Sequence, residues 1–178
     1  MLKLKYTKFS GVDNMLKAVL SRKNLSENDE FYSCIRDLVE SGSVAHLKDF
    51  SHHLGTSRFQ HCLNVSYYNF LVCRKLGLDA KAGARAGLLH DFFFYNRRDC
   101  KKSNIRFHAC AHPMIAFENA AELFPISELE SDMIVCHMWP ITKNFPRHRE
   151  TFVITFVDKF CAVAEIAATA VNRARKRG

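Results

Sequence analysis

The chain has 178 residues, of which 48% are apolar, so its length and composition suit one globular domain with a substantial core. Its formal net charge is +8, which favours anionic partners such as nucleotides, other phosphate compounds or nucleic acid. The apolar runs are too short to span a membrane, and the seven cysteines form no CxxC pair, which argues against a membrane anchor and a structural zinc site.

Cysteine usage and the N-terminal sequence point to the cytoplasm. The odd number of cysteines, scattered among helical stretches, is typical of reduced thiols. Residues 1–10 are basic and polar and contain none of the apolar sequence that a signal peptide requires. We therefore expect a cytoplasmic protein that has no membrane partner.

The first fifty residues are expected to form a helical extension packed on the core. A short helix is predicted over residues 14–22. An amphipathic helix is predicted between Ser26 and Gly42, with Gly42 as its left-handed terminal residue. A short apolar segment over residues 44–50 follows it.

Residues 51–170 are predicted to form the main helical domain. Ser57 and Gln60 are a capping box for a helix that ends at Gly77. Asp79 is the expected N-cap of the next helix, whose alanines and glycines would allow close approach to a neighbour.

Two further helices are expected after a basic, irregular segment. Pro113 suits the first position of a helix, which would place His112 at the N-cap. Ser127 and Glu130 form a second capping box, and the helix that they begin ends before Pro140.

The last helix is predicted from about residue 150 to residue 175, and residues 171–178 are interpreted as its solvated basic tail. Its apolar stripe is predicted to consist of Phe152, Phe156, Phe160, Val163 and Ile166. No segment alternates for long with a period of two. The expected fold is therefore all-α, a compact bundle of about six or more helices.

Six polar residues interrupt the apolar faces of these helices. They are His61, His90, Asp91, His112, His137 and Asp158. Any one of them alone is more simply explained as a satisfied core group, and the His-Asp pair alone equally suits the end of a helix. Five helices that each contribute such a residue predict a metal site in the interior of the bundle, because imidazole and carboxylate groups together bind divalent transition metals.

The order and context of these residues resemble the HD-domain phosphohydrolases over about residues 57–165. The matching motifs are Arg58-Phe-Gln-His61, Leu89-His90-Asp91, His108-Ala-Cys-Ala-His112-Pro113, Cys136-His137-Met-Trp139-Pro140 and Val157-Asp158-Lys159. Branches with this ordered set include diadenosine-polyphosphate hydrolases and cyclic-nucleotide phosphodiesterases. The adjacent His-His pair that marks the cyclic-di-GMP-degrading branch is absent near position 137.

The resemblance implies a centre of two divalent ions. The first ion would be ligated by His61, His90, Asp91 and Asp158. Asp91 would bridge to a second ion held by His112 and His137. The ions would activate a water molecule that cleaves a phosphoester or phosphoanhydride bond of a nucleotide or another small phosphate compound. The ligand types suit Fe, Mn, Zn, Co or Ni, and they do not select among them.

Substrate-binding and catalytic residues follow less directly from the sequence. His90 and Asp91 are expected at the reaction centre, and Arg58 and Lys159 are close enough in sequence to ligands to contact a phosphate. His108 could face the substrate, support a ligand or belong to a loop, and Trp139 could stack on a base or anchor the core. One of His52 and His53 could line the pocket, and the basic residues 97–106 could form its mouth or a solvated surface.

Four functional hypotheses remain open at this point. The first is the phosphohydrolase, and the second is a regulatory domain that binds metal or nucleotide without turnover. Nucleic-acid binding is less favoured, because no aromatic residues alternate with the basic ones in the tail. Oxygen-dependent redox chemistry at a di-iron centre occurs in the same superfamily. The sequence also leaves open whether the chain forms a homodimer.

Overall fold

The computed structural model describes residues 18, 30–52, 56–96 and 105–175, and for residues 105–109 it describes only the backbone. Within these ranges the chain forms seven α-helices, one 3₁₀ helix and no named strand. They are α1 (Glu30–Glu40), α2 (Gly42–Ala45), the 3₁₀ helix η2 (His46–Asp49), α3 (Arg58–Lys75), α4 (Ala80–Leu89), α5 (Ile105–Leu123), α6 (Glu128–Cys136) and α7 (Arg149–Arg175). The predicted all-α bundle is confirmed.

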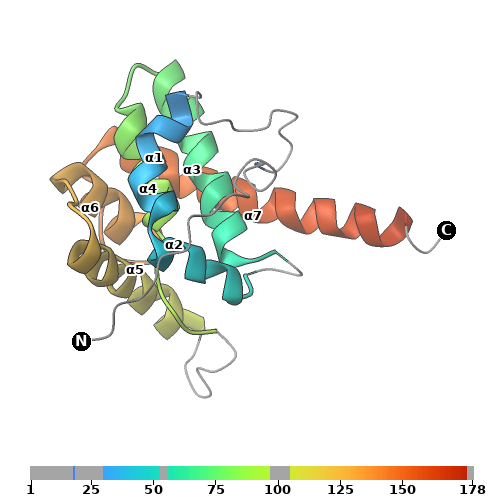
Figure 1. Ribbon diagram of the computed structural model, residues 1–178. Helices are drawn as coiled ribbons and strands as arrows, with labels where there is room; N and C mark the ends of the chain where they lie inside the picture. The colour runs from blue at the N-terminus through green and yellow to red at the C-terminus, as the bar shows by residue number, and fades with distance from the viewer. Residues whose placement is uncertain (1–17, 19–29, 53–55, 97–104, 176–178) are drawn as a thin grey trace, which may run out of the picture.

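The helices surround α3 and α4, which pack closely on each other, and α7 extends beyond the rest of the bundle toward the C-terminus (Figure 1). α1 and α2 share one apolar core with the later helices, through residues such as Phe31, Ile35 and Val44. The described residues of α1 and α2 are thus packed on the later helices. No helix among the described residues has the length and apolar character that a membrane span requires.

Small residues bring α3 and α4 together, as the sequence predicts. A Cβ atom on Gly87 would lie 2.6 Å from Cα of Ser66, so no larger residue fits there without moving the backbone. The hydroxyl of Ser66 donates to the carbonyl oxygen of Ala84 at 2.6 Å across the same contact. α4 can therefore deliver His90 and Asp91 deep into the bundle.

The predicted helix ends are mostly confirmed. The hydroxyl of Ser57 accepts from the backbone N–H of Gln60, and Gly77 follows α3 with a positive φ of 67°. The predicted capping box at Ser57 is only half formed, because the side-chain amide of Gln60 donates to Asn64 one turn further along α3. Asp79 caps α4, and the capping box at the start of α6 is complete.

Gly42 does not end α1 as predicted, because it is the first residue of α2. Ser41 performs both tasks at this junction. Its hydroxyl donates to the carbonyl oxygen of Leu38 at the end of α1 and accepts from the backbone N–H of Val44 in α2. One side chain thus satisfies groups of two successive helices. Apart from buried Ala18, the helix predicted over residues 14–22 lies outside the described residues.

The predicted position of Pro113 at the start of a helix is wrong, because α5 begins at Ile105 and Pro113 lies inside it. His112 is consequently an interior helical residue rather than an N-cap. The preference of proline for the first turn does not forbid an interior position; it adds a cost for one lost backbone hydrogen bond. The alanines before Pro113 favour helix, and His112 and Pro113 are both buried.

The predicted apolar stripe of α7 is also wrong. Phe156 is 68% exposed and Val163 is 67% exposed, and Phe160 and Ile166 are exposed as well. Only Phe152 of the five is partly buried. The buried residues of α7 are Thr151, Ile154, Thr155, Val157, Cys161 and Glu165. The helix turns this more polar face inward because its carboxylates pair with histidine in the interior.

Candidate metal centre

The six residues of the predicted metal site lie together in the interior of the bundle. His61 is on α3, His90 and Asp91 follow α4, and His112 is on α5. His137 is the C-cap of α6, and Asp158 is on α7. The four histidines and Asp91 are buried, and Asp158 is partly buried. Segments far apart in the sequence thus contribute donors to one place.

One group of donors surrounds Asp158. Its Oδ1 lies 3.1 Å from Nε2 of His61 and 3.7 Å from Nε2 of His90. One ligand atom from each of these three residues lies within 4.8 Å of the others. Two imidazole nitrogens and a carboxylate oxygen are suitable ligands for a divalent transition metal.

A second group of donors lies on the side of α5 and α6. Nε2 of His112 lies 3.3 Å from Oδ1 of Asp91, and Nε2 of His137 lies 4.0 Å from the same oxygen. The two imidazole Nε2 atoms are 3.0 Å apart. At this distance two unprotonated nitrogens would direct their lone pairs at each other. The spacing therefore requires either a proton or a cation between the two rings.

Asp91 stands between the two groups and directs one oxygen to each. Its Oδ1 faces His112 and His137, whereas its Oδ2 lies 3.9 Å from Nε2 of His90. Oδ1 is buried and makes no hydrogen bond to any described residue. A buried carboxylate oxygen without a hydrogen bond is costly, and a bound cation is one way to remove that cost.

Hydrogen bonds on the far side of three rings determine how they face the centre. Nδ1 of His90 donates to the carbonyl oxygen of Gly87 at 2.9 Å, and Nδ1 of His137 donates to that of Ile134 at 2.8 Å. Nδ1 of His61 donates to the carboxylate of Glu165 at 3.1 Å. These acceptors fix the proton on Nδ1, so in the neutral rings the Nε2 lone pairs are available to a metal.

The charged neighbours shift the pKa values in opposite directions. Burial alone would lower the pKa of His61, but hydrogen bonds to Asp158 and Glu165 raise it to about 10. Burial, with the nearby His112 and His90, lowers the pKa of His137 to about 3. Burial would raise the pKa of Asp91, yet His90 and the other imidazoles hold it below the usual value. Because the pKa of His61 is raised, its ring is protonated at neutral pH when no metal is bound. Nε2 of His61 then carries the proton that faces Oδ1 of Asp158.

Glu165 is a residue of this centre that the sequence analysis missed. It is buried on α7 and accepts from both His61 and Asn64, the latter at 2.6 Å. Gln60 extends the chain of hydrogen bonds by donating to Asn64. The spacing from Asp158 to Glu165 is seven residues, which places both on one face of a helix, and this was the available signal.

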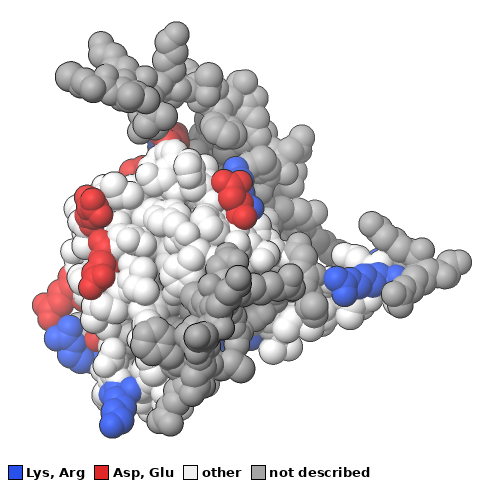
Figure 2. All heavy atoms as spheres, turned by 90° about the horizontal axis from the view of Figure 1, so that it is seen from below, with Lys and Arg blue, Asp and Glu red and all other residues white. Residues whose placement is uncertain are grey.

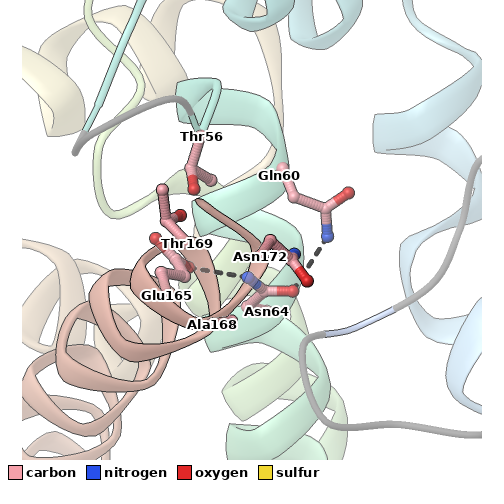
Figure 3. A pocket seen from close by; sticks show the side chains of 7 residues that line it. All are labelled: Thr56, Gln60, Asn64, Glu165, Ala168, Thr169 and Asn172. Carbon is pink, nitrogen blue, oxygen red and sulfur yellow. Dashed lines mark hydrogen bonds between the residues drawn. The ribbon is translucent and has the colours of Figure 1, made fainter. Parts of the chain in front are cut away.

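A small surface pocket borders this hydrogen-bonded chain. Its volume is about 180 Å³, and Figure 3 shows Gln60, Asn64 and Glu165 along it together with residues of the C-terminal half of α7. The lining residues are Thr56, Gln60, Asn64, Glu165, Ala168, Thr169 and Asn172. Because they are mostly uncharged and polar, the pocket suits water next to Glu165 rather than a phosphate compound.

Arg58 is buried and supports the segment that follows Asp91. Its Nη1 donates to the carbonyl oxygen of Phe93 at 2.6 Å and its Nη2 to that of Tyr95 at 2.9 Å. The guanidinium also lies 3.7 Å from the centre of the Phe93 ring. These contacts give Arg58 a structural role, and its predicted contact with a phosphate stays a prediction.

The other predicted substrate residues lie in different settings. Nζ of Lys159 donates to the carbonyl oxygen of Thr155 in its own helix. Trp139 makes edge-to-face contacts with Phe145 and Phe152, which favours its interpretation as a packing residue. The side chain of His108, and most of the basic segment 97–106, lie outside the described residues.

The donor set fits a divalent transition metal. The nitrogen and oxygen donors, the ring orientations and the buried Oδ1 of Asp91 together provide two neighbouring groups of ligands. No family model matches the chain, and no curated protein or solved structure matches it either. The site's own geometry and chemistry therefore carry the functional argument.

Proposed function

We propose that this chain is a metal-dependent phosphohydrolase of the HD type with a centre of two ions. The observation that carries the proposal is the position of Asp91, whose two oxygens face two separate groups of imidazoles. A carboxylate in this position is suited to bridge two cations. His61, His90 and Asp158 would complete the ligands on one side, and His112 and His137 those on the other.

The proposed chemistry is hydrolysis of a phosphoester or phosphoanhydride bond in a nucleotide or other small phosphate compound. When bound, two divalent ions supply positive charge to the phosphate oxygens and lower the pKa of a water nucleophile. The charge of such ions outweighs that of Asp91, Asp158 and Glu165, so the loaded site would attract an anion. The net positive charge of the chain favours the same class of substrate.

The role of the protein in this reaction is to hold the metal-ligating atoms in place and to limit the access of water. Carbonyl oxygens of Gly87 and Ile134 and the carboxylate of Glu165 orient three of the imidazoles. The close contact of α3 and α4 keeps His90 and Asp91 buried. In such a buried site, electrostatic attraction for a phosphate is stronger than at an exposed surface.

The second candidate is a regulatory domain that binds metal or nucleotide without turnover. Arg58 and Lys159 favour it, because both direct their cationic groups to main-chain carbonyl oxygens. Nucleic-acid binding has less support. On the face shown in Figure 2, the described Lys and Arg side chains occur in small separated groups instead of one continuous basic surface.

Metal analysis followed by an activity screen tests the proposal. Protein purified without chelator or oxygen should contain close to two transition-metal ions per chain and should hydrolyse nucleotides or a nitrophenyl phosphate diester. Asp91→Asn removes the bridging charge with little change in volume, and it should lose metal and activity. Asp49→Asn, on the exposed end of η2, is the matched control and should keep both.

The two candidate functions give different results in this experiment. Two ions per chain without hydrolysis of any substrate would support the regulatory domain. Full metal content and turnover in Asp91→Asn would show that the centre has been assigned to the wrong residues.

A further inference from the structure

His52 lies at the edge of the candidate metal centre, next to the group around Asp158. Its Nδ1 is 3.8 Å from Oδ2 of Asp91, and its ring stacks on that of His61 with centroids 3.8 Å apart. The sequence offered His52 and His53 as equal candidates for the pocket. His53 lies outside the described residues, whereas His52 borders the centre directly.

The backbone on either side of His52 is tied to the beginning of α3. The N–H of His52 donates to the carbonyl oxygen of Thr56 at 2.9 Å, and the N–H of Arg58 donates to that of Phe50 at 2.8 Å. α3 also carries His61. The position of His52 relative to His61 is therefore set by main-chain hydrogen bonds and by ring stacking together.

The stacked arrangement decides what His52 can bind. Ligand atoms of His52, His61 and Asp91 lie within 4.8 Å of one another, which by distance alone would permit one shared ion. However, an imidazole lone pair lies in the plane of its ring, and the two rings are inclined by only 16°. Two stacked rings that are nearly parallel, with centroids 3.8 Å apart, do not direct in-plane lone pairs at one ion. His52 thus faces a group beside the ion that His61 would bind.

We propose that His52 donates a hydrogen bond to a phosphoryl oxygen of the substrate at this centre. This inference rests on the proposed function and extends it to substrate binding. An imidazole carries at least one N–H whether it is neutral or charged, so the contact is available in both forms. The side chain of His52 is 16% exposed, whereas that of His61 is fully buried, so His52 is the more accessible of the two stacked rings.

The surroundings favour this role for His52 over the two cations that the sequence suggested. Arg58 and Lys159 direct their charged groups to main-chain carbonyl oxygens. His52 instead has its Nδ1 toward the same carboxylate that is proposed to bridge the ions. An N–H donor beside Asp91 would contact the phosphate close to the bond that is cleaved. It would therefore favour substrates that have a phosphoryl oxygen next to that bond.

Binding of inorganic phosphate to the metal-loaded protein tests the inference without a turnover assay. His52→Ala should keep the metal content of the unaltered protein and bind phosphate about tenfold more weakly, as expected for loss of one hydrogen bond to a charged group. His52→Gln retains an N–H donor and should recover part of that loss. His46→Ala, an exposed histidine on η2, is the matched control and should bind phosphate normally.

Each other result would overturn the inference in a distinct way. Unchanged phosphate affinity in His52→Ala would show that His52 does not contact the phosphate, and it would leave the proposed function intact. Loss of metal in His52→Ala would make it a metal ligand instead. Failure of the unaltered, metal-loaded protein to bind phosphate would contradict both the inference and the proposed function.

Discussion

Glu165 of α7 accepts a hydrogen bond from Nδ1 of His61 on α3 at 3.1 Å, and Nε2 of the same ring lies 3.1 Å from Oδ1 of Asp158. His61 is thus held between two carboxylates of one helix. Asn64 secures Glu165 from one turn further along α3. A carboxylate in this position fixes the ring and increases the basicity of the nitrogen that would bind a metal.

Replacement of Glu165 by glutamine should weaken metal binding. The amide retains the volume but removes the charge that orients His61, and such supporting groups typically contribute about 10-fold to 100-fold in affinity. Metal titration of the purified protein measures the change. Glu118→Gln, on the exposed side of α5, is the control. Equal affinity in Glu165→Gln and the control would show that Glu165 does not support the site.

Metal uptake should release a proton from His61. The pKa of His61 is raised to about 10, so at neutral pH the metal-free ring is charged and its Nε2 must lose a proton to bind metal. The apparent affinity should therefore rise with pH by about tenfold per unit below 10, for this one group. Calorimetry in buffers of different ionisation enthalpy counts the protons, and a count of zero would contradict the prediction.

The same shift has a consequence for the stability of the metal-free protein. Because the folded-state pKa is raised above the ordinary value near 6.5, charged His61 stabilises the fold fully below that pH. This contribution is lost as pH rises through about 10. Chemical denaturation of the metal-free protein between pH 6 and 10 should show falling stability, and Glu165→Gln should reduce the decline.

Removal of both donors on the α5 and α6 side should leave one ion per chain. His112 and His137 lie on the side of Oδ1 of Asp91, apart from His61 and Asp158. The variant His112→Ala with His137→Ala should therefore lower the metal content from two ions to one, measured by elemental analysis. The control pair is His46→Ala with His148→Ala. Two ions retained in the first variant would exclude the two-group arrangement.

Asp132 is expected to be important for stability and not for metal binding. It is buried on α6 and accepts from the hydroxyl of Thr151 at 2.6 Å and from the backbone N–H of Arg147 at 3.0 Å. Asp132→Asn should lower the free energy of unfolding by roughly 1–3 kcal/mol, because the amide offers these donors one neutral acceptor oxygen in place of two charged ones. Denaturant titration measures the loss, and the metal content should not change.

The pH dependence of that effect follows from the pKa of Asp132. Burial would raise this pKa, but hydrogen bonds from Thr151 and Arg147 lower it below the ordinary value. The carboxylate therefore stabilises the fold at neutral pH, and this contribution is lost as pH falls through the lowered folded-state pKa. The stability difference between Asp132→Asn and the unaltered protein should narrow in acid. A stability difference that stays constant as the pH falls would contradict the stabilising role assigned to the Asp132 carboxylate.

A larger residue at position 87 should disturb the contact that positions the centre. The added Cβ of Gly87→Ala would meet backbone atoms of Ser66 at 2.6 Å and 2.8 Å, so α3 and α4 must separate. Overpacking of this kind typically costs about 1–3 kcal/mol. Gly83→Ala meets the Sγ atom of Cys73 at 3.0 Å, which a side-chain movement can relieve, and should cost less. Thermal denaturation of the two variants compares them.

Local sequence signals predicted most of the helices and their ends. The caps at Ser57, Asp79 and Ser127 and the left-handed Gly77 depend on interactions within a few residues. The two errors at helix ends have separate causes. Ser41 separates α1 and α2 through contacts to Leu38 and Val44, a local signal that the prediction from Gly42 overlooked. Pro113 lies inside α5, where it is buried.

The candidate ligands could be identified from the sequence because each one interrupts an apolar helical face. The sequence did not indicate how these ligands divide between the two oxygens of Asp91. It also did not indicate that Glu165 supports His61 or where His52 lies. Apolar periodicity also selected the wrong face of α7, because Phe156 and Val163 have the expected spacing but are exposed. Helix propensity and capping are local properties of the chain. Which polar face turns inward depends on pairing free energy between residues about a hundred positions apart, and only the tertiary structure determines those pairs.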